Sequence, residues 1–135
     1  MTSNELKQLR QLLFLEVAEA AKWIGNCEPR TWQRWEKGDR SIPPDVAQEM
    51  KMLACTRQEM LAVEFDPDDP NYRYFASHEE FAALIGNKNP VKWRLAQSVG
   101  AALYAELSAD EWRNEETIEG GFGGSLATLE RYNLL

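Results

Sequence analysis

The chain contains a five-residue run, Gly25-Asn-Cys-Glu-Pro29, between two segments whose apolar residues have helical spacing. Glycine readily adopts the left-handed conformation that ends a helix. Proline suits the first position of a helix, because the N–H that it lacks would have no partner there. We therefore expect one helix to end at Gly25 and the next to begin at Pro29, with a tight turn between them.

Both helices beside this turn are short. The first is predicted over residues 17–24, and its apolar side consists of Val17, Ala20, Ala21 and Ile24. The second is predicted over residues 29–37 and stops at Gly38. Two short helices joined by a tight turn make a candidate helix-turn-helix motif.

Further helices flank this motif. Thr2 and Glu5 form a capping-box pattern ahead of leucines at helical spacing, which predicts a first helix near the N-terminus. After the motif, Pro43 and Pro44 open a long amphipathic segment that predicts a fourth helix over residues 44–64. The first 65 residues are thus expected to form a helical domain.

The helix predicted over residues 29–37 has two chemically different sides. At about 100° per residue, positions i, i+3, i+4 and i+7 share one narrow stripe. Here these positions are Arg30, Gln33, Arg34 and Lys37. Trp32 and Trp35 point the other way, toward a hydrophobic core. A recognition helix needs this arrangement, because it presents polar groups to the DNA groove while its apolar side holds it in place.

The polar residue types match the chemistry of duplex DNA. Arginine pairs with guanine O6 and N7, glutamine pairs with adenine N6 and N7, and lysine is a phosphate partner. Thr31 could contact a phosphate or a thymine methyl group, and Arg40 in the following turn could contact the flanking DNA backbone. A solvated polar helix face is the simpler interpretation of such a stripe, and the wider pattern described below favours DNA. The predicted DNA-binding residues are Arg30, Thr31, Gln33, Arg34, Lys37 and Arg40.

The second half of the chain is organised differently. A breaker-rich linker at residues 66–70 marks a boundary, and the alternating aromatic residues 72–75 predict a short strand. Ser77 caps a predicted helix that ends at Gly86, and residues 91–107 predict a long helix. That helix is apolar over more than half of its circumference, so we expect a partner subunit to cover part of it. The predicted dimer interface consists of Tyr74, Trp93, Leu95, Val99 and Leu103.

The net charge of −7 initially argues against a nucleic-acid partner, since polyanions repel an acidic protein. The acidity is unevenly distributed, however. Residues 1–64 carry nine Lys and Arg against ten Asp and Glu, whereas residues 65–135 carry six against twelve. A nearly neutral first half with a basic helix can still face DNA, and the acidic half would then point away from it.

Several segments resemble the phage-repressor-like helix-turn-helix signature. They are Leu9-Arg10, Ala18–Ala21, Ile24-Gly25, Thr31-Trp-Gln-Arg-Trp-Glu-Lys-Gly38 and Pro43. The turn after Gly25 is one residue longer than that family usually has, and this longer turn points to a narrower family. From Gly25 through Pro43-x-Asp-Val-x-Gln-Glu-Met50, the chain resembles the anti-CRISPR-associated (Aca-type) repressors and the YdiL-like regulators. The likeness continues through Arg73-Tyr-Phe75, Trp93–Val99 and Leu103-Tyr104, and covers about residues 1–107.

This resemblance implies a homodimeric transcriptional regulator that binds inverted repeats in double-stranded DNA and represses its own operon. The expected fold is mainly α with an α+β organisation, in which a helix-turn-helix domain is followed by a small α/β dimerisation domain. The expected domains are residues 1–65 for DNA binding and 66–107 for dimerisation, with an acidic, glycine-containing tail at 108–135. The resemblance does not explain that tail. Some members of the family also bind RNA.

Nothing in the sequence favours an enzyme. His78 is the one histidine and has no cysteine near it in sequence, so we expect neither a metal site nor a catalytic role. No cofactor is expected, because Gly121-Phe-Gly123 lacks the third glycine and preceding strand of a dinucleotide site. The absence of a long apolar run argues against a membrane partner, and the two unpaired cysteines favour the cytoplasm.

Two alternative functions remain open. The same basic helix suits a regulator that binds a structured RNA leader. The chain also fits a protein-interaction module whose helix-turn-helix is degenerate and whose acidic half binds the partner protein. Gel-shift series with the promoter duplex and with the transcript would distinguish RNA binding from DNA binding. An association that does not depend on salt, with no protection of DNA, would favour the protein-interaction module.

Overall fold

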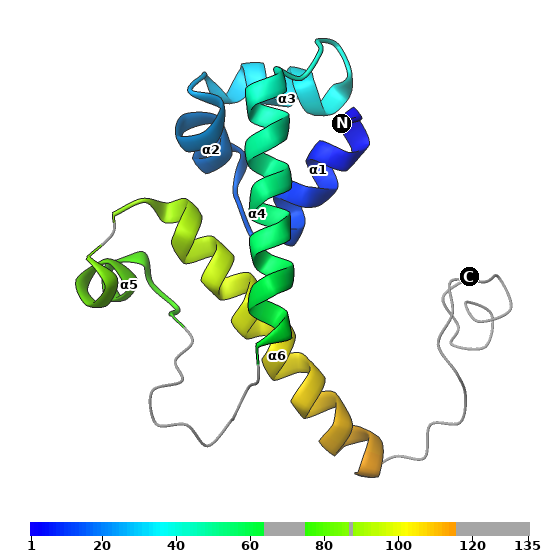
Figure 1. Ribbon diagram of the computed structural model, residues 1–135, viewed down its shortest axis with the longest axis vertical. Helices are drawn as coiled ribbons and strands as arrows, with labels where there is room; N and C mark the ends of the chain where they lie inside the picture. Colours follow the sequence, from blue (N-terminus) through cyan, green and yellow to red (C-terminus); the bar gives the residue numbers. More distant parts are fainter. Residues whose placement is uncertain (64–74, 87, 116–135) are drawn as a thin grey trace, which may run out of the picture. The chain divides into compact units, whose positions relative to one another are not determined.

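The computed structural model describes residues 1–63, 75–86 and 88–115, whose regular structure is helical. The helices are α1 (Ser3–Leu12), α2 (Val17–Ala20), the π-helical η1 (Ala21–Gly25), α3 (Pro29–Lys37), α4 (Pro44–Ala62), α5 (His78–Ile85) and α6 (Pro90–Glu115) (Figure 1). The chain divides into two compact units, Met1–Tyr104 and Ala105–Leu135. The first unit contains α2, η1 and α3, which form the candidate helix-turn-helix motif.

Local capping chemistry explains the helix boundaries in the first unit. At the start of α1, the backbone N–H of Glu5 donates to Thr2 Oγ1 at 3.1 Å, and Thr2 N–H donates to Glu5 Oε1 at 3.2 Å. This confirms the predicted capping box. Helix α3 begins at Pro29 and is capped by Gly38 with φ of 83°, as the sequence predicts.

The end of the helix before the turn is π-helical. The N–H of Asn26, in the left-handed conformation with φ of 47°, donates to the carbonyl of Ala21, and Cys27 N–H donates to the same oxygen at 3.0 Å. A π-helical turn contains more residues than an α-helical one. The longer turn seen in the sequence is therefore accompanied by a wider last helical turn, and Ala21 and Ile24 remain buried.

Gly25 lies where a side chain has no room. A Cβ placed there would meet Cys27 Sγ at 2.9 Å, Trp35 at 3.0 Å and Trp32 at 3.1 Å. We expect Gly25→Ala to destabilise the protein by about 1–3 kcal/mol through overpacking, measured by urea denaturation. The double variant with Cys27→Ala should regain only part of the loss, because both indole contacts remain. An unchanged unfolding midpoint for Gly25→Ala would contradict this account.

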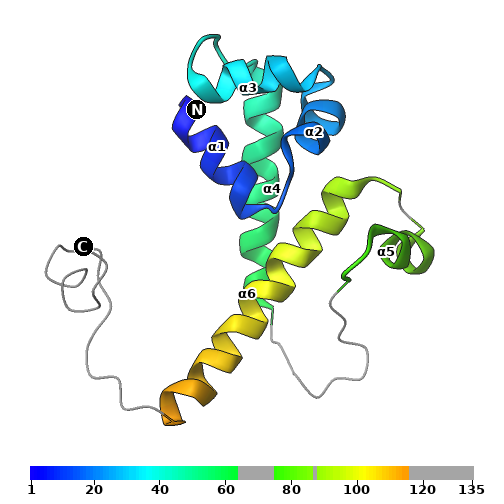
Figure 2. The same ribbon diagram turned by 180° about the vertical axis from the view of Figure 1, so that it is seen from behind.

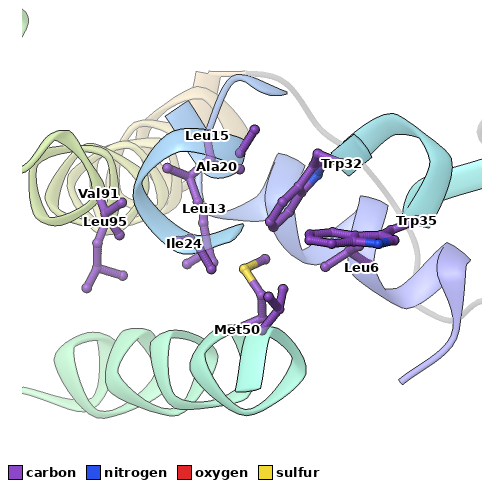
Figure 3. Close-up of a cluster of buried hydrophobic side chains, with 12 residues drawn as sticks. Leu6, Leu13, Leu15, Ala20, Ile24, Trp32, Trp35, Met50, Val91 and Leu95 are labelled. Carbon is purple, nitrogen blue, oxygen red and sulfur yellow. The ribbon is translucent and has the colours of Figure 1, made fainter. Parts of the chain in front are cut away.

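The core of the first unit brings together residues from helices on both sides of the predicted domain boundary. Helix α1 contacts α3 and α4, and η1 also contacts both of them (Figures 1 and 2). Figure 3 shows Met50 between the two indoles on one side and a group of aliphatic side chains on the other. Val91 and Leu95 of α6 belong to the same buried cluster. The first part of α6 thus packs against the helix-turn-helix motif.

The predicted α+β fold class is wrong, since the described part of the chain has no strand and therefore no α/β dimerisation domain. A strand must pair with another strand to satisfy its backbone polar groups. The predicted strand at residues 72–75 lies, except for Phe75, outside the described residues. The carbonyl of Phe75 accepts hydrogen bonds from Trp93 Nε1 at 2.8 Å and Gln97 Nε2 at 2.9 Å. Side chains of α6, rather than a neighbouring strand, satisfy this backbone group.

The last helix is longer than predicted. The sequence indicates a helix over residues 91–107 followed by a tail, whereas α6 continues to Glu115. Acidic residues at positions 110 and 111 therefore belong to a helix. The linker at 66–70 and the glycine-containing segment at 120–124 both lie outside the described residues, so the predicted domain limits remain predictions.

Candidate nucleic-acid interface

Helix α3 separates its polar and apolar side chains as its sequence predicts. Trp32 and Trp35 are only 0% and 6% exposed, with ring centroids 5.6 Å apart. The six predicted DNA-binding residues lie on α3 or in the loop after it. Four are exposed, namely Arg30, Gln33, Lys37 and Arg40, and two are half-buried, namely Thr31 and Arg34. The helix thus offers solvent a surface of guanidinium, amide and ammonium groups.

A buried carboxylate fixes α3 against α1. Glu36 accepts from Arg10 Nε at 2.7 Å and from Arg10 Nη2 at 3.1 Å, which is a bidentate pair. The indole N–H of Trp32 donates to the same carboxylate at 2.5 Å. Arg10 also donates to the carbonyl of Leu15 at 3.0 Å. These contacts set both the rotation of α3 and the position of its polar face.

Sequence reasoning missed the role of Arg10 and Glu36. The two side chains are 13% and 8% exposed, so both belong to the interior of the motif. One signal was available, because Glu36 lies four residues after Trp32 and therefore on the same side of the helix. The partner on α1, 26 residues away, follows only from the tertiary structure.

The loop after α3 meets the start of the chain. A polar pocket of about 420 Å³ lies there, lined by Met1, Thr2, Ser3, Gly38, Arg40, Ser41 and Ile42. Arg40 is thereby placed beside the N-terminal end of α1, where backbone N–H groups favour anions. Hydroxyl and guanidinium groups near the polar face of α3 are suited to contacts with phosphates.

The predicted dimer-interface residues are largely used inside the first unit. Trp93, Leu95 and Val99 are 8%, 7% and 6% exposed. The ring of Trp93 stacks on His78 with centroids 5.4 Å apart. Leu103 is half-buried, and Tyr74 lies outside the described residues. Much of the apolar surface of α6 is therefore covered by the chain itself, and a part for these residues in dimerisation remains a prediction.

The described ranges 1–63, 75–86 and 88–115 offer little support for another kind of site. No cluster of three or more His, Cys, Asp or Glu side chains there is arranged to hold a metal ion. Burial raises the pKa of the Cys27 thiol, which keeps it in the less reactive protonated form. None of the described helices has the length and apolar character needed to cross a bilayer. The polar face of α3 is the strongest candidate site in these ranges.

Comparison with known proteins places this geometry in a family. The chain is similar to the Aca2 repressor of Pectobacterium phage ZF40, with 43% identity over 114 residues that cover 82% of this chain and 98% of that protein. It is also similar to YdiL of Escherichia coli K12, with 27% identity over 111 residues covering 78% and 94% of the two chains. The profile of the Aca2/YdiL-like family matches residues 1–111. The chain therefore belongs to the Aca2/YdiL-like family.

Proposed function

We propose that this protein is a repressor that binds an inverted-repeat operator in double-stranded DNA as a homodimer. One observation carries the proposal: α3 exposes a continuous polar face while Trp32, Trp35 and the Glu36–Arg10 pair lock its other side into the core. A helix held this firmly can enter a major groove without losing its register. The naming of a 43% identical relative as a repressor supports the same function.

In this proposal the residues of α3 divide into two groups. Arg30, Gln33 and Arg34 contact base edges, because arginine and glutamine form bidentate hydrogen bonds with purines. Thr31 contacts a phosphate or a thymine methyl group, and Lys37 and Arg40 contact phosphates. Base contacts give specificity, whereas phosphate contacts give position and salt dependence.

The proposed homodimer matches the symmetry of an inverted repeat. Two recognition helices about 34 Å apart would enter successive major grooves on one side of the duplex. Tyr104 of α6 is 64% exposed, next to the half-buried Leu103. Large aromatic side chains are enriched in protein interfaces, which supports this part of α6 as a subunit contact. A sedimentation mass of one chain at micromolar concentration would contradict the dimer.

Footprinting on the DNA upstream of the protein's own gene tests the function. We expect protection of two half-sites whose centres are about 10 base pairs apart, or a multiple of that distance. The transcript leader, tested in the same concentration series, distinguishes DNA from RNA. Tighter binding to the leader than to the duplex would overturn the DNA proposal.

Replacing Lys37 by alanine should weaken binding to all DNA sequences to a similar extent. A lysine that neutralises one phosphate contributes about 0.9 to the slope of log affinity against log salt, so a dimer should lose about two units of slope. Affinities measured at several salt concentrations, on operator and random duplex, give both quantities. Lys92, which is exposed on α6, provides the control, and its replacement should leave the slope unchanged. A variant at Lys37 that alters base preference instead would show that this lysine contacts bases.

A further inference from the structure

A network of directional polar contacts joins the helix-turn-helix motif to α6. The Nε of Arg94 donates to Glu19 Oε1 at 2.9 Å and to Glu19 Oε2 at 3.2 Å. Arg94 Nη1 donates to the side-chain oxygen of Gln97 at 3.0 Å, and Arg94 Nη2 lies 3.6 Å from Glu16 Oε1. The side chains of Arg94 and Glu19 are 19% and 17% exposed, so water screens this pair only partly.

Both members of the pair are fixed by other contacts. The guanidinium of Arg94 lies over the ring of Trp93, 4.1 Å from its centroid. Gln97, which accepts from Arg94, itself donates to the carbonyl of Phe75. Glu19 also accepts from the backbone N–H of Glu16 at 3.0 Å, at the start of α2. The pair therefore joins two groups that are each already held in place.

The Arg94–Glu19 contact, called the joint below, can affect the position of α3. Glu19 belongs to α2, which continues directly into η1 and, after the turn, into α3. Around the joint, Val91 and Leu95 of α6 face the aliphatic part of the core that contains Leu13 and Ile24 (Figure 3). Aliphatic contacts are non-directional, so they permit small sliding movements. Here one N–H of Arg94 is shared between both oxygens of Glu19 while Nη1 donates to Gln97, so the guanidinium is held in orientation as well as in distance.

We infer that Glu19 and Arg94 are positioning residues that set the half-site spacing accepted by the proposed dimer. The inference rests on the proposed function, with α6 as the helix that joins the subunits. Neither residue needs to contact DNA. The pair determines the angle between the motif and the first part of α6. Because the dimer contains this angle twice, a change in it alters the distance between the two recognition helices. An error of one base pair displaces a half-site by about 3.4 Å along the DNA axis, which a rigid joint cannot follow.

Operators that differ only in the central spacer test this inference. The half-sites stay the same, and the spacer is shortened or lengthened by one base pair. We expect the wild type to bind the best spacing about tenfold more tightly than either neighbour, which corresponds to about 1.4 kcal/mol. Arg94→Met keeps an unbranched apolar stem beside Trp93 but removes the guanidinium and its hydrogen bonds. This variant should reduce the preference to about threefold or less, with unchanged affinity for a duplex that carries one half-site.

Two further variants complete the experiment. Glu16→Gln removes the neighbouring carboxylate, whose side chain is 72% exposed, and should keep the wild-type spacing preference. Arg94→Lys restores the charge but not the fork of donors, so it should restore only part of the preference. If Arg94→Met proves unfolded by circular dichroism, Glu19→Gln, which weakens the pair from the other side, decides the question.

The outcomes separate the inference from the function. A folded Arg94→Met protein with the wild-type spacing preference would overturn the positioning role. A loss of single-half-site affinity equal to the loss on the full operator would also overturn it, because it would indicate damage within the motif. A wild type that binds no operator would overturn the proposed function, and the inference with it.

Discussion

Replacing Arg30, Gln33 and Arg34 together by alanine should abolish sequence-specific binding to the operator. Each bidentate base contact contributes about 1–3 kcal/mol of discrimination, and a dimer would lose three contacts in each half-site. Specific complexes are typically about 10³-fold or more tighter than nonspecific ones. We therefore expect affinity to fall by at least about 10³-fold, to the level of random duplex, in a gel-shift titration at fixed salt.

The triple variant should keep its fold, which makes the test interpretable. Arg30 and Gln33 are exposed, and Arg34 is half-buried on the side away from the core. Alanine is the best helix former, so α3 should persist. A matched control replaces Lys7, Gln8 and Gln11 on the exposed side of α1, and it should bind as the wild type does. Equal affinity of the triple variant and the wild type for the operator would show that α3 is not the recognition helix.

Features governed by local chemistry could be predicted from the sequence. The limits of α3 at Pro29 and Lys37, the capping box at Thr2 and the burial of both tryptophans all agree with the structure. Each depends on residues within about one helical turn of one another, where capping and helical periodicity decide the outcome. The polar face of α3 was predicted for the same reason.

Features that depend on distant partners could not be predicted. The apolar side of α6 indicated that it must pack against something, but the spacing of apolar residues does not distinguish the same chain from a second one. In the structure, Val91 and Leu95 pack with the helix-turn-helix core. The aromatic alternation before α5 predicted a strand, yet Phe75 contacts α6 through its carbonyl. Similarly, Arg94 and Glu19 are 75 residues apart, and nothing in their local sequence pairs them.

Replacing Arg10 by alanine should cause one of the largest losses of stability that a single polar substitution can produce in this chain. It would leave Glu36, whose side chain is 8% exposed, as a buried carboxylate without its cation. Removing one partner of a buried ion pair typically costs about 3–5 kcal/mol. Such a loss is a large fraction of the total stability of a small domain, so the midpoint of urea denaturation should fall sharply.

A second variant separates the unpaired charge from the loss of packing. Arg10→Met with Glu36→Leu removes both charges and keeps similar side-chain volumes, and such replacements are often neutral. Recovery should remain incomplete here, because Trp32 Nε1 donates to Glu36 and would lose its acceptor, at a cost of about 1–3 kcal/mol. If Arg10→Ala cost less than about 1 kcal/mol, the pair would be no stronger than an exposed one. The orientation of α3 would then depend on the packing of Trp32 and Trp35 rather than on the carboxylate between α1 and α3.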